Sequence, residues 1–397
     1  MKRRSVPVTR HVRPALLIAG ILLIATNLRA PITAVAPLLN MIRASFHLST
    51  TEAGMLTTLP LLAFAAVSPF AALLAREYGL ERTLFGALVV IGMGIVLRSA
   101  GTVWLLYLGT WFIGSGAAIG NVLLPSLLKR DFAGKIATLT AIYALTMGAA
   151  AAIGSVAAVP LSQQSGLGWP FALGTLVFLP LVTAILWLPQ LRNRTSPAKD
   201  TATPPHGGRV WHSALAWQVT LFLGLNSFVY YIAVGWLPAI LGESGYSPAQ
   251  AGSLHGLLQL ATALPGLMLV PVIGRMKDQR AIAFIASILS MTGFLGLLVA
   301  PAWAALWTPL VGFGTGAAII LGLAFVSLRA SSSHQAAALS GMAQCIGYLL
   351  ASVGPTLAGA LHQSFAGWGM ALTLCVLLCL VMSVFGLLAG RAIHITK

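Results

Sequence analysis

The chain has 397 residues, of which 58% are hydrophobic and only 8% are charged. This composition excludes a soluble globular domain, in which about 25% of the residues are charged. Long apolar segments recur along the chain, and an α-helix satisfies its own backbone hydrogen bonds in lipid. We therefore predict an all-α membrane protein, since a barrel would show short segments of alternating polarity.

The positive charge is distributed unevenly along the chain. If both termini are cytoplasmic, the cytoplasmic segments hold 20 of the 23 Lys and Arg residues. The external loops then hold only Arg43 and Arg98, and Arg29 lies inside a span. This distribution follows the positive-inside rule. It predicts an even number of spans with cytoplasmic N and C termini, and the net charge of +16 needs no nucleic-acid partner.

In chain order, the apolar segments predict twelve spans. They cover approximately residues 14–39, 52–75, 83–99, 103–128, 136–160, 170–189, 213–241, 248–273, 281–300, 303–328, 334–361 and 368–390. A polar linker rich in Pro and Gly separates the first six spans from the last six. The predicted organisation is a basic cytoplasmic N-terminus (1–13), a six-helix bundle (14–189), a cytoplasmic linker (190–212), a second six-helix bundle (213–391) and a cytoplasmic C-terminus (392–397). The apolar run after residue 13 is too long for a signal peptide, so we expect it to be retained.

The two halves carry similar strings at similar positions. GSGAAI at 114–119 recurs 200 residues later as GTGAAI at 314–319, and Asn27 in span 1 has Asn226 in span 7. Each match is short, but together they indicate two parallel repeats. Such an architecture places a binding site at the interface of the repeats, near the bilayer midplane.

Arg29 lies near the centre of the first span. An arginine does not lose its proton in proteins, and a charge at the bilayer centre costs roughly 2.5–3.5 kcal/mol on insertion scales. Thr26 and Thr33 share its helical face, and Pro31 removes a backbone donor beside it. We interpret Arg29 as a substrate-binding residue, with a structural arginine bound to carbonyl groups as the alternative.

Other polar residues inside the spans are candidates for the same site. If spans 1, 4, 7 and 10 face the centre, Asn121 of span 4 and Asn226 and Tyr230 of span 7 converge on Arg29. Spans 8 and 11 contribute polar stripes at helical spacing, with His255, Gln259, Gln344 and Tyr348. Buried polar groups need partners, so these stripes do not face lipid. The alternative for each residue is a hydrogen bond between helices.

Groups for other chemistry are scarce in the chain. None of the seven acidic residues lies in the middle of a span, so no carboxylate relay for protons is visible. His255 is the histidine well inside a span that titrates near neutral pH, and we predict it as a candidate for proton coupling. We find no metal-ligand cluster, phosphate-binding loop or catalytic pair, and we expect no cofactor, no metal and no enzyme.

Several longer strings resemble a known family. They are TNLR at 26–29, LTTLPLLAF at 56–64, GNVLLP at 120–125, KRDF at 129–132, GSLHGLLQ at 252–259 and AAALSGMAQ at 336–344. By these strings the chain resembles the major facilitator superfamily and, within it, the CynX/NimT (cyanate and nitroimidazole transporter) family. The nearest likeness is to its 2-nitroimidazole exporter branch. This resemblance implies the fold with two pseudo-symmetric six-helix bundles and secondary transport in the bacterial inner membrane, in the direction of efflux.

One signature of the superfamily is altered. The loop after span 2 usually reads GxLADRxG, whereas ALLAREYG at 72–79 has alanine for the first glycine and Arg76 for the acid. We expect a cytoplasmic gate at this loop, with Glu77 as the candidate substitute for the missing acid.

The leading functional hypothesis is an alternating-access transporter of a small planar molecule, namely a 2-nitroimidazole-type compound. The planar donor fork of Arg29 suits a nitro group or an anion, so uptake of a small anion such as cyanate is the alternative. A non-transporting membrane receptor or scaffold is the alternative of another class. It would need a sizeable domain outside the membrane, and the span pattern leaves no room for one. We expect a monomer, as two-repeat carriers often are.

Overall fold

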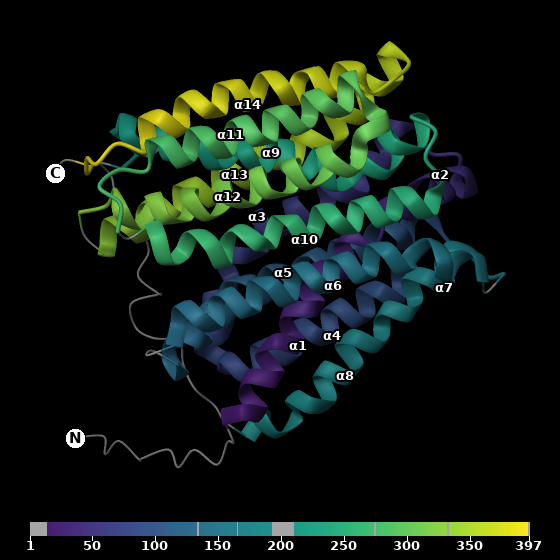
Figure 1. The fold of residues 1–397 in the computed structure, drawn as a ribbon. Coiled ribbons are helices and arrows are strands. Elements are labelled where there is room, and N and C mark those ends of the chain that lie inside the picture. The colour runs from purple at the N-terminus through teal and green to yellow at the C-terminus, as the bar shows by residue number, and fades with distance from the viewer. Residues whose placement is uncertain are drawn as a thin grey trace.

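The structure is a computed structural model that describes residues 14–132, 135–164, 166–192, 210–273, 275–331 and 333–395. Among these residues, 12 helices are long and apolar enough to cross a membrane. They confirm the twelve predicted spans, with ends that differ by a few residues. In Figure 1, α1 begins and α14 ends at the left, which we call the termini end, and α2 and α7 lie at the right, which we call the opposite end.

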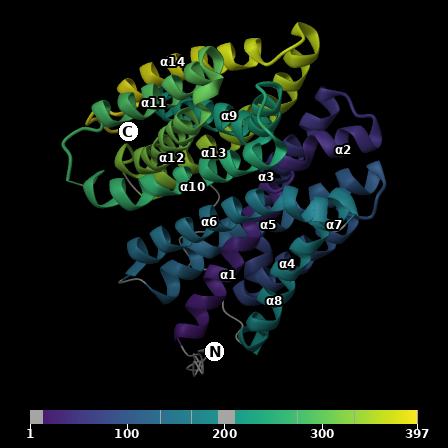
Figure 2. The ribbon, with the colours of Figure 1, turned by 45° about the vertical axis from the view of Figure 1, so that its right-hand side comes forward.

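The N-terminal half forms one bundle, seen in the lower part of Figures 1 and 2. Its elements are α1 (Pro14–Thr33), η1 (Ala36–Leu38), α2 (Leu39–Phe46), α3 (Thr50–Tyr78), α4 (Leu80–Arg98), α5 (Val103–Asp131), α6 (Ile136–Gln164), α7 (Gly168–Gly174), η3 (Thr175–Val177), α8 (Phe178–Trp187) and η4 (Leu188–Arg192). The sixth predicted span therefore consists of two α-helices joined by a 3₁₀ turn.

The C-terminal half forms the second bundle, above the first in both views. Its elements are η6 (Val210–His212), α9 (Ala214–Glu243), α10 (Pro248–Ile273), α11 (Arg280–Val299), η7 (Pro301–Trp303), α12 (Ala304–Leu328), α13 (Ser333–Phe365) and α14 (Gly369–Ala389). One apolar core lies almost entirely in the N-terminal bundle. The other fills the C-terminal bundle and continues into α2, η1 and α7, so the two bundles are joined near the opposite end.

The first span is not one continuous helix. α1 ends at Thr33, two residues after Pro31, and the chain continues through η1 into α2. Arg98, predicted to lie in an external loop, is instead in the last turn of α4 and is buried. Its Nη1 donates a hydrogen bond of 2.6 Å to the Pro31 carbonyl. Arg98 thus lies at the end of the predicted span 83–99 rather than in the loop with which it was counted, and it supplies a donor to one of the carbonyl groups that the end of α1 leaves unpaired.

Contacts of small residues define how the two repeats correspond. Gly114 of α5 packs against Pro60 of α3, and Gly312 of α12 packs against Leu258 of α10. Gly314, which the string match paired with Gly114, faces α11 instead. The string match at an offset of 200 residues therefore pairs glycines that face different helices. In a helix rich in Ala and Gly, similar strings do not fix the register.

An ion pair at the termini end is also repeated in altered form. Arg130 at the end of α5 bonds Glu81 at the start of α4 at 3.0 Å and Asp131 at 2.7 Å. At the corresponding place in the second bundle, Arg329 after α12 donates to Gln279 before α11. Burial lowers the pKa of Arg130, but its hydrogen bonds and the charges of both carboxylates outweigh this effect and raise it.

We predict that Arg130→Ala lowers the free energy of unfolding by on the order of 3 kcal/mol, because it removes one member of an ion pair whose Glu81 side chain is only 2% exposed. The measurement is thermal or denaturant unfolding in detergent. The matched control is Arg280→Ala, since the pair of Arg280 with Asp278 is 53% and 38% exposed and should contribute at most about 1 kcal/mol. Equal losses in the two variants would contradict the prediction.

Candidate functional site

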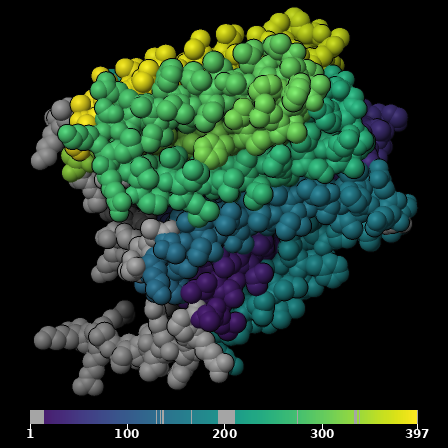
Figure 3. Space-filling model, viewed as in Figure 1, coloured from purple at the N-terminus to yellow at the C-terminus, as the bar shows by residue number. Residues whose placement is uncertain are grey.

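The two bundles meet along two pairs of helices, α3 with α13 and α6 with α10. A Cβ placed at Gly54 of α3 would lie 2.8 Å from the Pro355 carbonyl oxygen of α13. A Cβ placed at Gly256 of α10 would lie 3.0 Å from the Ala152 carbonyl oxygen of α6. The helices approach this closely because glycine presents no side chain. Figure 3 shows the boundary between the two halves on the molecular surface.

These contacts lie from the middle of the molecule toward the opposite end. On the α3–α13 side they begin where the Thr50 carbonyl lies against Gly359, and they extend to Phe64, whose ring meets that of Tyr348 at 5.5 Å. Gln344, one turn nearer the termini end, is exposed. The bundles are therefore closed toward the opposite end and separated toward the termini end.

Arg29 lies on α1 at the level where the two bundles begin to separate. Its guanidinium carbon is 5.3 Å from the centre of the Tyr230 ring on α9, so the arginine of one bundle faces the other bundle. The side chain lies deep in the molecule but keeps partial solvent access. Within the described residues, the guanidinium makes neither a hydrogen bond nor an ion pair. Its donors are therefore available to a ligand.

Further tyrosines surround this cation. Tyr143 of α6 and Tyr231 of α9 interact electrostatically with the guanidinium, and Tyr348 of α13 interacts with both of these tyrosines. The rings of Tyr230 and Tyr231 meet edge to face at 5.0 Å. Four of the seven tyrosines of the chain thus gather around Arg29. Tyr143 and Tyr231 were not predicted from the sequence, although both lie inside spans, where a phenolic hydroxyl needs a polar surrounding.

Two of the predicted residues connect to Arg29 through Tyr230. The Tyr230 hydroxyl donates to Gln259 Oε1 at 3.1 Å, and Gln259 Nε2 lies 3.2 Å from Nε2 of His255. His255 and Gln259 are one turn apart on α10 and completely buried. The structure therefore brings together Arg29, Tyr230, Gln259 and His255.

The remaining predicted residues have other surroundings. Asn226 is completely buried in the C-terminal bundle and donates to the Thr315 carbonyl of α12 at 3.1 Å. Asn121 bonds the Ala117 carbonyl of its own helix at 3.0 Å. Gln344 bonds Ser340 at 2.8 Å and lies one turn from Tyr348, on the side where the bundles are separated. Asn226 has no surface that a ligand reaches in this conformation, whereas Gln344 does.

The residues predicted for the gate, Arg76 and Glu77, lie in the last turn of α3 and are exposed. Near this turn, Arg130 pairs with Glu81 and Asp131, within one bundle. A gate contact of Arg76 and Glu77 stays a prediction.

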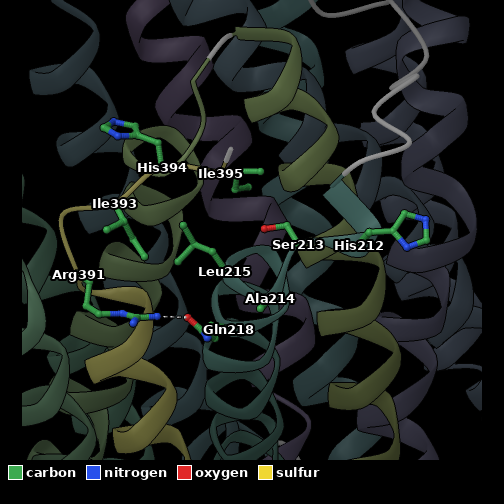
Figure 4. A pocket seen from close by; sticks show the side chains of 9 residues that line it. All are labelled: His212, Ser213, Ala214, Leu215, Gln218, Arg391, Ile393, His394 and Ile395. Atoms are coloured by element: carbon green, nitrogen blue, oxygen red, sulfur yellow. Dashed lines mark hydrogen bonds between the residues drawn. The ribbon is translucent and has the colours of Figure 1, made fainter. Parts of the chain in front are cut away.

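A pocket of about 600 Å³ lies at the termini end of the C-terminal bundle, lined by residues 212–215, Gln218, Arg391 and 393–395. Figure 4 shows Arg391 directed toward Gln218, and the two side chains are joined by a hydrogen bond of 3.1 Å. Gln218 precedes Tyr230 by twelve residues on α9, which is about 18 Å along the helix axis. This pocket is therefore separate from the site around Arg29.

Comparison with known proteins places the chain in a family. Residues 17–352 match the family model described as Major Facilitator Superfamily. The chain belongs to the Major Facilitator Superfamily. A 2-nitroimidazole transporter of Escherichia coli (strain K12) is 56% identical over 94% of this chain and 95% of its own length. The cyanate transport protein CynX of the same organism is 28% identical over 86% of this chain and 89% of its own length.

A solved structure of this superfamily fold is also similar. A bacterial homologue of the human lysosomal transporter Spinster, in an inward-facing and occupied conformation, matches with a TM-score of 0.74 at 16% identity, over 96% of this chain and 98% of that one. The predicted resemblance and fold are thus confirmed. The chain is a multi-pass membrane transporter of small molecules and not an enzyme.

In this superfamily protein, we predict that Gly54→Leu prevents the close approach of α3 and α13. The added side chain would collide with the Pro355 backbone and push α3 and α13 apart. Thr58 lies in this contact and is only 5% exposed, so a cysteine placed there should become accessible when the helices separate. The measurement is labelling of Thr58→Cys by a membrane-impermeant maleimide, with the exposed Cys345 replaced by serine. Gly86→Leu is the control, because a Cβ there meets nothing within 4 Å. Unchanged labelling of the Gly54→Leu protein would contradict the contact.

Proposed function

We propose that this protein is an alternating-access secondary transporter whose substrate binds between the bundles at Arg29, and that its substrate is a small planar molecule of the 2-nitroimidazole type. The observation that carries the proposal is a cation with free donors that tyrosines from both bundles surround. The 56% identity to a 2-nitroimidazole transporter supports the same substrate class. We further propose that the protein acts as a monomer in the bacterial inner membrane.

The chemistry of the site suits such a molecule. The guanidinium is planar and presents parallel donors, which match the two oxygen atoms of a nitro group. The partly exposed ring of Tyr231, which packs edge to face on the buried ring of Tyr230, offers an aromatic substrate stacked or edge-to-face packing. The hydroxyl groups of Tyr143 and Tyr348 provide additional polar partners at the margin. A planar heteroaromatic ring with one oxygen-rich substituent therefore uses both features of the site.

A second candidate is uptake of a small anion such as cyanate. The specific observation in its favour is that Arg29 has no acidic partner among the described residues, so an anion would compensate its charge. A buried charge is costly unless it is paired. The likeness to a cyanate transport protein is weaker, at 28% identity.

We propose efflux as the direction of transport, and the proposed topology is compatible with it. With cytoplasmic termini, as the positive-inside rule predicts, the contacts of α3–α13 and α6–α10 lie on the external side. Arg29 then has access from the cytoplasm in this conformation, and an exported substrate enters from that side. This supports efflux as the direction.

We predict that Arg29→Gln lowers substrate affinity about 10- to 100-fold, since a hydrogen bond to a charged group contributes about 1.5–3 kcal/mol. Arg29→Lys should recover part of the affinity, because it keeps the charge and loses the planar fork. The measurement is flux of radiolabelled 2-nitroimidazole, and separately of cyanate, into proteoliposomes. Arg280→Gln, an exposed arginine outside the site, is the control. Normal flux of both compounds by the Arg29→Gln variant would refute the site. If the unmutated protein transports cyanate and not 2-nitroimidazole, the second candidate is favoured.

For a planar substrate, we expect Tyr231→Leu to raise KM about 3- to 10-fold and Tyr231→Phe to have a smaller effect, because aromatic packing contributes about 0.5–1.5 kcal/mol. The matched control is Tyr246→Leu, since Tyr246 bonds the Pro301 carbonyl at the opposite end and lies outside the site. The same flux assay measures both. Equal effects of phenylalanine and leucine at position 231 would show that the ring contributes nothing.

A further inference from the structure

His255 joins the two bundles by a side chain that titrates. Its Nδ1 lies 3.0 Å from the Ser155 hydroxyl of α6, and its Nε2 lies 2.9 Å from the Val234 carbonyl of α9. The Val234 carbonyl only accepts, so Nε2 carries a hydrogen. The neutral ring then accepts from the Ser155 hydroxyl at Nδ1. Both nitrogen atoms of a neutral ring are therefore satisfied, although the ring is completely buried.

A second proton would change this arrangement. Nδ1 would become a donor, and the Ser155 hydroxyl would turn to the Ala151 carbonyl, 2.8 Å away. The added charge would be enclosed between α6, α9 and α10 with no counter-charge, and burying an unpaired charge is costly. The hydrogen bonds therefore accommodate either form of the ring, and it is the enclosure of a charge without an acidic partner among the described residues that disfavours the protonated form.

The ionisable groups around His255 reinforce this asymmetry. Arg29 of α1 acts on the ring electrostatically and repels a positive charge there. From α9 and α6, the other ionisable groups that approach are the tyrosines around Arg29. α12, which packs on α10, contains no ionisable side chain. Among α6, α9, α10 and α12, the one acid in the described residues is Glu243, at the far end of α9, where it bonds His362.

The equivalent contact on the other side of the molecule has different hydrogen bonds. There, Thr58 of α3 donates to the Ser352 carbonyl of α13 at 2.7 Å and lies 2.9 Å from the Thr356 hydroxyl. This contact also contains His362 of α13, whose Nδ1 lies 3.4 Å from the Thr50 hydroxyl of α3, but its Nε2 contacts the carboxylate of Glu243. Of the two contacts, α6–α10 is therefore the one whose histidine has no acidic partner among the described residues.

We propose that neutral His255 holds α6 and α10 together and that protonation of His255 separates them, so that acid opens the site toward the opposite end. This inference rests on the alternating access proposed above, but not on any particular substrate. The direction follows from linkage, because a proton favours the conformation in which the imidazolium is hydrated and removed from Arg29. A ligand anion at Arg29 would weaken the repulsion and allow the charged ring to be enclosed, which couples proton and substrate.

The test measures the distance between α6 and α10 without substrate. Gln163 and Ala249 are exposed residues at the opposite end of these helices, and a spin label on a cysteine at each reports their separation. The exposed Cys345 is replaced by serine. The pH is lowered from about 8 to about 5, across the ordinary histidine pKa of about 6.5. We expect the population with the longer distance to grow. Because one proton is involved, the ratio of the long-distance to the short-distance population should rise by at most about tenfold for each pH unit.

Variants separate His255 from other causes. His255→Gln and His255→Asn should lose the response to pH, and Ser155→Ala should show the longer distance already at about pH 8. Thr58→Val, the matched change in the other contact, and His362→Gln should keep the response. A pH response that persists in both His255 variants, or acid that shortens the distance, would overturn the proposal. Because no substrate is present, failure of the substrate assignment leaves these distances unaffected.

Discussion

The positive charge of Arg29 is the constraint on which the rest of this structure depends. An arginine in the middle of a membrane-spanning helix is costly, and no acidic side chain of the described residues compensates it. Instead, aromatic rings and partial access to solvent stabilise the charge. Tyr230 receives the cation on its ring face, an interaction of about 0.5–2 kcal/mol. The separation of the bundles toward the termini end follows the same need, because water and ligand must reach the guanidinium.

The closed part of the molecule is connected to this cation through side chains. Tyr230 bonds Gln259, and Gln259 lies beside His255, whose ring contacts Ser155 of the other bundle. A change of charge at Arg29 therefore acts near the contact that closes the opposite end. Both contacts contain a histidine, but His362 of α3–α13 lies beside Glu243 and near the end of the helices, whereas His255 of α6–α10 is completely buried and has no acidic partner among the described residues. The pseudo-symmetry of the bundles is thus broken in the charges that surround the two rings.

The sequence predicted those features that each helix determines by itself. Every span must satisfy its own backbone in lipid, so hydropathy located all twelve, and the unusual charge singled out Arg29. Features that depend on how helices rotate against one another were not accessible. Tyr143 and Tyr231 approach Arg29 only through the packing of α6 and α9 around α1. Asn226 shares a span with Tyr230, one turn away, yet it faces α12.

Other differences have a similar cause. The burial of Arg98 follows from the end of α1 at Thr33, which creates a need for a donor that no local pattern signals. The register of the two repeats is set by contacts of single glycines, and these are hidden in strings of small residues. All of the predicted site residues stay predictions, and for Asn121, Gln344, Arg76 and Glu77 the structure shows no contact with the group around Arg29.

The glycines at the inter-bundle contact have a consequence for how the bundles close. Where Gly54, Gly256 and Gly359 meet the facing backbone, the surfaces carry no long side chains that interlock. A side chain at any of these three positions would hold the facing helices apart. The seal between the bundles therefore depends on the hydrogen atom that each of these glycines carries in place of a side chain.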